Sequence, residues 1–227
     1  MIMVDVLHTL DLGVSQVVLG HLFVEFWNSS LAKGNNRETK TIELWNLIKD
    51  YYNNAQPPTR ISKLTVEMIK QDGKGPKFRG KGAETRHMVP FGVQLAKMMA
   101  DHVGGNDLRA NQIVSMMEYL FGFYTLFGQI PFDASKASLW ARRFCLIYSD
   151  LSRKSSKDNL WPFKPKFHLF IHLAEKQTAE IGDPSLFWAY RDEDFVGLIG
   201  AIAMPRGGKR LGTTMPNTVV DKYRALS

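Results

Sequence analysis

The sequence predicts a mainly α-helical protein with a small α/β portion. Apolar residues recur at helical spacings almost throughout residues 84–151, where Gly104-Gly105 and Pro131 separate three stretches. At the N-terminus, residues 1–7 form a short apolar, β-leaning run. A strand that ends near Asp5 is therefore expected to lead into a long helix.

The helices expected after this strand follow from the same apolar spacing. Turn-forming residues at 28–39 predict a surface loop after the first helix, and Thr41 is a candidate cap for the second. Pro57-Pro58 is expected to end that second helix, and residues 152–158 form a polar linker. The expected helices span residues 10–27, 41–52, 62–70, 88–102, 108–128 and 134–151.

Composition excludes several classes of protein. A chain of 227 residues with 44% apolar residues suits a soluble globular protein that buries a sizeable core. The single cysteine, Cys145, excludes an internal disulfide framework and a thiolate-rich zinc site, and it is consistent with a reducing compartment. We find no signal-peptide pattern and no run of 18 uncharged apolar residues, so we expect neither secretion nor a membrane span.

Basic residues concentrate in one part of the chain. The net charge is +7, and the stretch from Arg60 to Arg86 holds eight basic residues against three acidic ones. Its inner part, residues 73–82, is rich in glycine, which predicts a flexible basic loop able to follow a phosphate backbone. A nucleotide-binding loop of the Walker type is excluded because Lys81 is followed by Gly82 rather than by Ser or Thr. The alternative is an ordinary solvated loop.

Three consecutive carboxylates, Asp192, Glu193 and Asp194, form the strongest candidate for an active centre. They could be the first turn of a helix, where the helix dipole favours negative charge, or they could face a metal ion or another cation. A second acidic signal, Asp5 with His8, is set in the apolar run at the start of the chain. We interpret the two stretches as one site.

A histidine pair forms a separate candidate site. His168 and His172 lie four residues apart and could share one helical face, which is a spacing that can bind zinc. The zinc hydrolase signature, however, places Glu directly after the first His, and Leu169 stands there. A packing or hydrogen-bonding role is therefore favoured for both histidines.

Two groups of motifs give the chain a resemblance to a known family. Asp5-Val-Leu-His8, followed by Leu19-Gly20, resembles the stretch around the second catalytic aspartate of CACTA-type (En/Spm-like) DDE transposases. The end of the chain is similar to the closing region of that family, in order and in approximate spacing. The matching motifs there are His172-Leu-Ala-Glu175, Gly182-Asp-Pro, Trp188-Ala-Tyr190, Glu193-Asp-Phe-Val-Gly197 and Pro205-Arg206.

The resemblance implies an RNase H-like catalytic core, interrupted by a large helical insertion, that cuts and joins DNA. Three carboxylates in such a core hold two Mg²⁺ or Mn²⁺ ions, which activate the attacking hydroxyl and stabilise the leaving oxygen. Asp5 would be the second carboxylate and Glu193 the third, both as metal ligands, while His8 would orient a phosphate or a carboxylate. The core would take residues 1–27 and 160–227, and the insertion, with its basic loop 70–86, would take residues 28–159.

DNA is the partner that the resemblance implies, with nuclear localisation and a possible homo-oligomer. The residues expected to contact DNA are Lys74, Lys77, Arg79, Lys81, Arg206, Lys209 and Arg210.

The sequence also departs from the family pattern. The first catalytic aspartate of the family lies upstream of the stretch that matches Asp5, and no residue before Met1 supplies it, so we expect a fragment that is inactive alone. Glu193 is chosen as the third ligand because it lies four residues before Gly197, although Asp192 or Asp194 could replace it. The alternatives are an inactive or domesticated DNA-binding protein and a helical interaction module.

Overall fold

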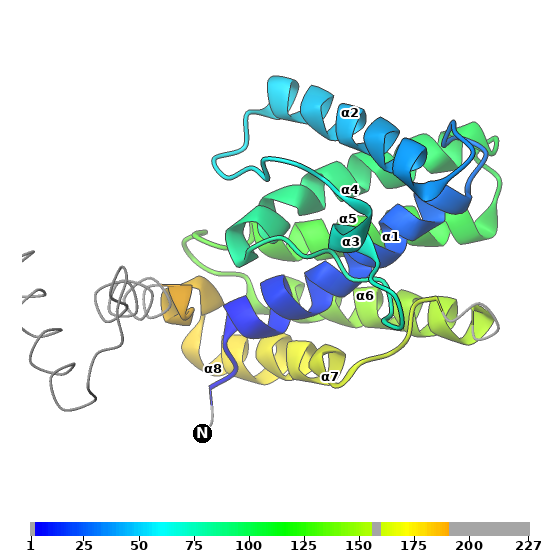
Figure 1. The fold of residues 1–227 in the computed structure, drawn as a ribbon. Helices are drawn as coiled ribbons and strands as arrows, with labels where there is room; N and C mark the ends of the chain where they lie inside the picture. Colours follow the sequence, from blue (N-terminus) through cyan, green and yellow to red (C-terminus); the bar gives the residue numbers. More distant parts are fainter. Residues whose placement is uncertain (1–2, 156–159, 191–227) are drawn as a thin grey trace, which may run out of the picture. The chain divides into compact units, whose positions relative to one another are not determined.

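The computed structural model describes residues 3–155 and 160–190, and all regular elements in these ranges are helices (Figure 1). The chain divides into two compact units, Met1–Phe187 and Trp188–Ser227. The second unit is described only at residues 188–190, where the rings of Trp188 and Tyr190 meet edge to face with centroids 5.2 Å apart. The helices described below belong to the first unit.

A long apolar helix runs through the centre of this unit (Figure 1). It begins as the π-helix η1 (Leu7–Ser15) and continues directly as α1 (Gln16–Asn28). By length and composition Leu7–Asn28 could span a membrane, but 83% of its most apolar window is buried inside the fold. Helices α2, α3, α4 and α7 pack around it, and this burial explains why the helix is so apolar.

Three successive helices form the largest packed layer, as the apolar spacing predicts. They are α4 (Gly82–His102), α5 (Leu108–Thr125) and α6 (Ala134–Lys154), and α5 packs against both of the others. Met116, Met117, Leu120 and Phe123 of α5 are completely buried between its neighbours. The short loops between these helices carry glycines with positive φ, at Gly104, Gly105 and Gly128.

Two further helices lie before this layer in the sequence. Helix α2 (Arg37–Ala55) begins four residues earlier than predicted, because its cap is Asn36 and not Thr41. The Asn36 side chain accepts a hydrogen bond from the Thr39 backbone N–H at 2.9 Å. Of the helix predicted at residues 62–70, only α3 (Val66–Ile69) forms.

The chain then returns to the long central helix. It forms α7 (Pro165–His172), the π-helix η2 (Leu173–Gln177), α8 (Thr178–Ile181) and the 3₁₀ turn η3 (Pro184–Phe187). Pro165 opens α7, where the missing backbone N–H is tolerated. Helix α7 packs on η1, and its Phe167 stacks on Phe144 of α6 with ring centroids 6.0 Å apart.

The predicted fold class is wrong, because residues 3–155 and 160–190 contain no strand and so no α/β, RNase H-like core. Val4, expected near the end of a strand, pairs with a side chain instead. The Val4 backbone N–H donates to Gln177 Oε1 at 2.7 Å, and its carbonyl accepts from Gln177 Nε2 at 3.1 Å. After Asp5 the chain turns helical at once, because Leu7, Leu10 and Val14 follow the helical spacing and are all buried.

Candidate functional site

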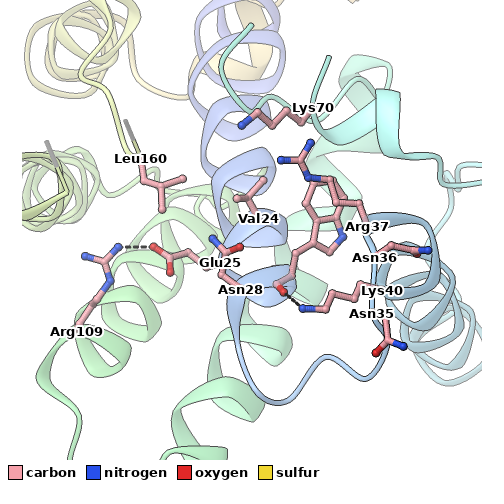
Figure 2. A pocket seen from close by; sticks show the side chains of 11 residues that line it. Val24, Glu25, Asn28, Asn35, Asn36, Arg37, Lys40, Lys70, Arg109 and Leu160 are labelled. Carbon is pink, nitrogen blue, oxygen red and sulfur yellow. Dashed lines mark hydrogen bonds and ion pairs between the residues drawn. The ribbon is translucent and has the colours of Figure 1, made fainter. Parts of the chain in front are cut away.

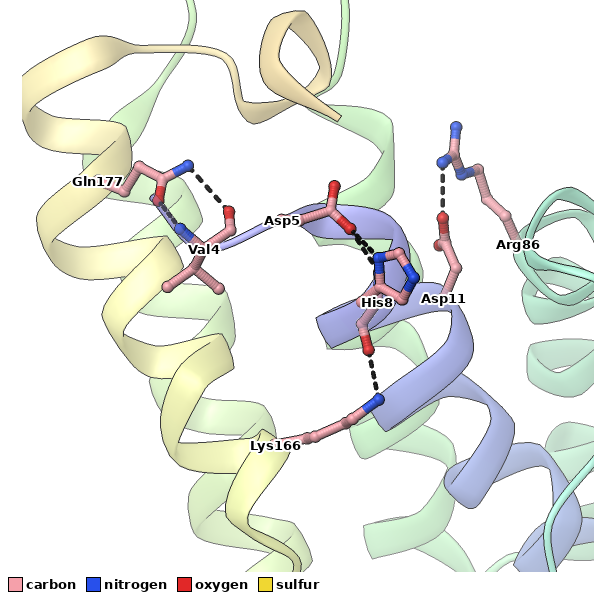
Figure 3. A network of polar contacts seen from close by, with 7 residues as sticks. All are labelled: Val4, Asp5, His8, Asp11, Arg86, Lys166 and Gln177. Carbon is pink, nitrogen blue, oxygen red and sulfur yellow. Dashed lines mark hydrogen bonds and ion pairs between the residues drawn. The ribbon is translucent and has the colours of Figure 1, made fainter. Parts of the chain in front are cut away.

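Asp5 and His8, the predicted catalytic pair at the start of the chain, are brought together where η1 begins (Figure 3). Asp5 Oδ2 accepts the backbone N–H of His8 at 2.8 Å and lies 2.7 Å from its Nδ1. The same carboxylate therefore caps the helix and fixes the imidazole. Because the His8 side chain is 51% exposed, the pair lies at the surface of the unit.

A buried polar network lies one turn further along the same helix, and the sequence analysis missed it. Asp11 has no exposed surface, and its Oδ2 accepts from Arg86 Nη2 of α4 at 2.7 Å (Figure 3). Its Oδ1 accepts the hydroxyl of Tyr124 of α5 at 2.5 Å, and that hydroxyl lies 2.8 Å from Ser15 Oγ. Burial, and then the Asp11 charge, raise the pKa of Tyr124 well above its usual value. The sequence signal that could have revealed this network is Asp11 itself, the one acidic residue in the apolar run of residues 6–19.

The predicted basic loop is anchored to the central helix by contacts that its glycine content did not predict. Phe78 is completely buried and meets Phe23 of α1 edge to face, with ring centroids 5.7 Å apart. The Phe78 backbone N–H donates to the Gln16 carbonyl at 2.8 Å, and the Gln16 side chain donates back to the Gly80 carbonyl at 2.7 Å. These bonds hold residues 77–80 on α1.

Among the predicted DNA contacts, Lys77 meets two lysines from a distant part of the chain. Lys77, Lys164 and Lys166, named here the lysine cluster, line one cavity of about 410 Å³ beside η1 and α1. None of the residues that line this cavity is acidic. They are Leu12, Gly13, Val17, Lys77, Lys164, Pro165, Lys166 and Phe167.

The lysine cluster is a site of positive potential. Burial lowers the pKa of Lys77, and the charges of Lys166 and Arg79 add to this effect. Lys166 is fixed by a hydrogen bond from its Nζ to the His8 carbonyl at 2.7 Å (Figure 3). A β-carbon at Gly13 would lie 2.6 Å from Lys166 Cδ, so the glycine lets this lysine lie across η1.

Among the other predicted DNA contacts on this segment, Arg79 is half-buried and its backbone N–H donates to the Met68 carbonyl at 2.8 Å. Lys74 and Lys81 lie on either side of it. Lys74 is exposed, and its Nζ donates to Gln71 Oε1 at 3.2 Å. The Lys81 backbone N–H donates to Glu84 Oε2 at 2.7 Å and so helps to begin α4. The remaining predicted DNA contacts lie outside the described residues; they are Arg206, Lys209 and Arg210. The acidic triplet, which includes the predicted metal ligand Glu193, also lies outside them.

His168 and His172 do share one face of α7, as their spacing predicts. Their Nε2 atoms lie 2.8 Å apart, so one ring donates a hydrogen bond to the other. The hydrogen-bonding interpretation of this pair is confirmed, and neither histidine belongs to a larger group of candidate ligands in the described ranges.

The described residues do not by themselves fit a pair of divalent metal ions. Two such ions need several carboxylate oxygens, and residues 3–155 and 160–190 contain no group of three His, Cys, Asp or Glu side chains that could share a metal. Asp5 is the one predicted metal ligand in these ranges.

What the geometry does offer is a helical scaffold with an ordered carboxylate and imidazole pair at one end of η1 and a positively charged cavity along its side. Comparison of the chain with protein families, with curated proteins and with solved structures finds no match.

Proposed function

We propose that this chain is a DNA-binding helical part of a DDE-type transposase, and that the lysine cluster holds the phosphate backbone of the DNA. One observation carries the DNA-binding proposal. Lys77 is brought beside Lys164 and Lys166 around a cavity that no acidic residue lines. Ammonium groups that lie close together with reduced access to water repel one another and raise the free energy of the folded protein. A bound phosphate offsets this repulsion.

The shape of this site also supports a phosphate backbone as the ligand. Lys77 comes from the anchored basic segment, while Lys164 and Lys166 lie on either side of Pro165 at the start of α7. The three cations are therefore held by two separate segments against one helix, and their positions do not depend on a free loop. Backbone contacts of this kind bind DNA with little sequence preference.

The transposase part of the proposal rests on the order of the motifs around Asp5 and at the end of the chain. The Asp5 and His8 pair supports it, because His8 fixes the orientation of the carboxylate that would serve as a ligand. Strand transfer is proposed only for a longer protein that supplies the remaining carboxylates and Mg²⁺ or Mn²⁺. In such a protein, Asp5→Asn would abolish metal-dependent DNA cleavage and leave DNA binding intact.

The DNA-binding proposal is tested by titrating this chain into a fluorescent DNA duplex and following anisotropy between about 50 and 300 mM KCl. Lys77→Gln and Lys164→Gln should each weaken binding and reduce the slope of log K against log salt by about 1. Lys49→Gln, which removes an exposed lysine on α2, is the matched control and should change neither quantity. Absence of binding at the lowest salt, or equal effects of all three substitutions, would contradict the proposal.

A further inference from the structure

The cavity at the lysine cluster is lined by two kinds of side chain. Among the described residues that line it, only the three lysines are polar, and the other side chains are apolar. Its volume of about 410 Å³ is within the range of small-molecule sites in proteins, so a phosphate group held by the lysines leaves most of it unfilled. A ligand that uses the whole cavity must therefore carry an apolar group beside its negative charge. The apolar side chains are Leu12, Val17, Pro165 and Phe167.

This apolar wall is accessible to a ligand. Val17 and Phe167 are buried and form its floor, whereas Leu12 is half-buried and Pro165 is exposed. Two of the lysines, Lys164 and Lys166, are exposed as well, and Lys77 is half-buried. Both the cations and the apolar wall can therefore be reached from solvent.

Two glycines on the central helix place the cations on either side of the apolar wall. A β-carbon at Gly13 would lie 2.6 Å from Lys166 Cδ, so Lys166 crosses the helix at this point. A β-carbon at Gly20 would lie 2.4 Å from Lys77 Cα. The two glycines are seven residues apart, which is two helical turns or about 10 Å, and Val17 lies between them. Apolar surface thus separates two cations, just as each base of a nucleic-acid strand lies between two phosphates.

A larger cavity, of about 790 Å³ where the end of α1 faces the start of α2, lacks this combination (Figure 2). Its wall is mostly polar and includes an acidic residue, Glu25, which pairs with Arg109. A second cation there, Lys40, donates to the Trp27 carbonyl. Protein groups already engage these cations, whereas no acidic residue among the described ones lines the cavity at the lysine cluster.

We propose that the apolar wall of this cavity binds one unstacked base of single-stranded DNA, while the lysine cluster holds the phosphates on either side of that base. The inference rests on the proposed DNA binding and extends it from the backbone to the base. In a duplex the faces of the bases are covered by their neighbours, whereas a base of a single strand leaves the stack at little cost and can pack on apolar side chains. Because only lysine side chains offer hydrogen bonds there, we expect little preference among bases.

Two fluorescent strands of equal charge test the inference by anisotropy on the whole chain. One is dodecathymidylate, and the other is a strand of the same length with an abasic tetrahydrofuran unit in place of every nucleoside. The thymidylate strand should bind about tenfold more tightly, which is the contribution expected of one base packed against the protein. Lys77→Gln should weaken the binding of both strands, because both carry the same phosphates.

Substitutions in the apolar wall locate the base. Leu12→Ala removes part of this wall and should lower the ratio of the two affinities severalfold. Leu146→Ala removes an exposed leucine of α6 that does not line this cavity, and as the matched control it should keep the wild-type ratio. If Leu12→Ala impairs folding, Pro165→Ala tests the same wall at an exposed position.

The outcomes separate this inference from the proposed function. Equal affinity for the two strands would overturn the inference and leave the proposed binding of the phosphate backbone standing. A tighter thymidylate strand whose advantage survives both Leu12→Ala and Pro165→Ala would also overturn it, because the base would then be held elsewhere. Failure of both strands to bind at about 50 mM KCl would contradict the proposed function as well.

Discussion

Tyr124 donates its phenolic hydrogen to the buried carboxylate of Asp11 at 2.5 Å, and this bond joins α5 to the first turns of the central helix. Arg86 of α4 pairs with the second oxygen of the same carboxylate at 2.7 Å. Three helices thus meet at one buried charge, which needs these partners because an unpaired buried carboxylate is strongly unfavourable.

We predict that Tyr124→Phe destabilises the protein by about 1.5–3 kcal/mol, the usual contribution of a hydrogen bond to a charged group. The substitution keeps the buried ring and removes only the hydroxyl that bonds Asp11 and Ser15. Urea unfolding followed by circular dichroism measures the change. Tyr119→Phe removes a surface hydroxyl on the same helix, 3.1 Å from Arg143, and serves as the control. Equal losses in the two variants would show that the Asp11 bond adds nothing to stability.

The second prediction concerns His21, which is completely buried in α1 and accepts the Trp161 backbone N–H through Nδ1 at 3.2 Å. Burial lowers its pKa from 6.5 to about 3, with smaller contributions from Lys164 and Lys70. The unfolded chain therefore binds a proton that the folded protein excludes. Stability should fall as the pH drops below about 6.5, and this loss is complete only near pH 3.

At about pH 5 the expected loss from His21 is about 2 kcal/mol relative to pH 7.5. Urea midpoints of the wild type and of His21→Gln at both pH values measure it, since the variant lacks this proton linkage and should show the smaller pH dependence. His102→Gln, at an exposed histidine, should keep the wild-type dependence. If His21→Gln and the wild type lose equal stability between the two pH values, the fold does not prevent the protonation of His21.

The sequence predicted α4, α5 and α6 because each is long, strongly periodic and bounded by glycine or proline, so that local pattern and tertiary packing agree. The start of the chain was predicted as a strand because Val4 and Val6 are β-branched within a short apolar run, which periodicity alone cannot distinguish from buried helix. The outcome was decided by residues far along the chain. Gln177 supplies the hydrogen bonds that a neighbouring strand would have made to Val4.

The candidate sites were predictable only where they are local. The contact between Asp5 and His8, and the one between His168 and His172, follow from spacings of three and four residues on a helix. One lysine of the cluster was predicted: Lys77 was singled out by the basic segment. Lys164 and Lys166 lie far along the chain, next to a proline that opens α7.

The third prediction concerns Gly20, where α1 touches the backbone of the basic segment. A β-carbon at this position would lie 2.4 Å from both the Cα and the N of Lys77, a distance that forces backbone atoms apart. Alanine favours a helix over glycine by about 1 kcal/mol, but we expect the clash to outweigh this gain and Gly20→Ala to destabilise the protein by about 1–3 kcal/mol. The displaced Lys77 should also weaken DNA binding. Gly75→Ala in the same segment meets no atom within 4 Å and is the control for both measurements, urea unfolding and DNA anisotropy. An unchanged or higher stability of Gly20→Ala would show that residues 77–80 do not rest on α1 in solution.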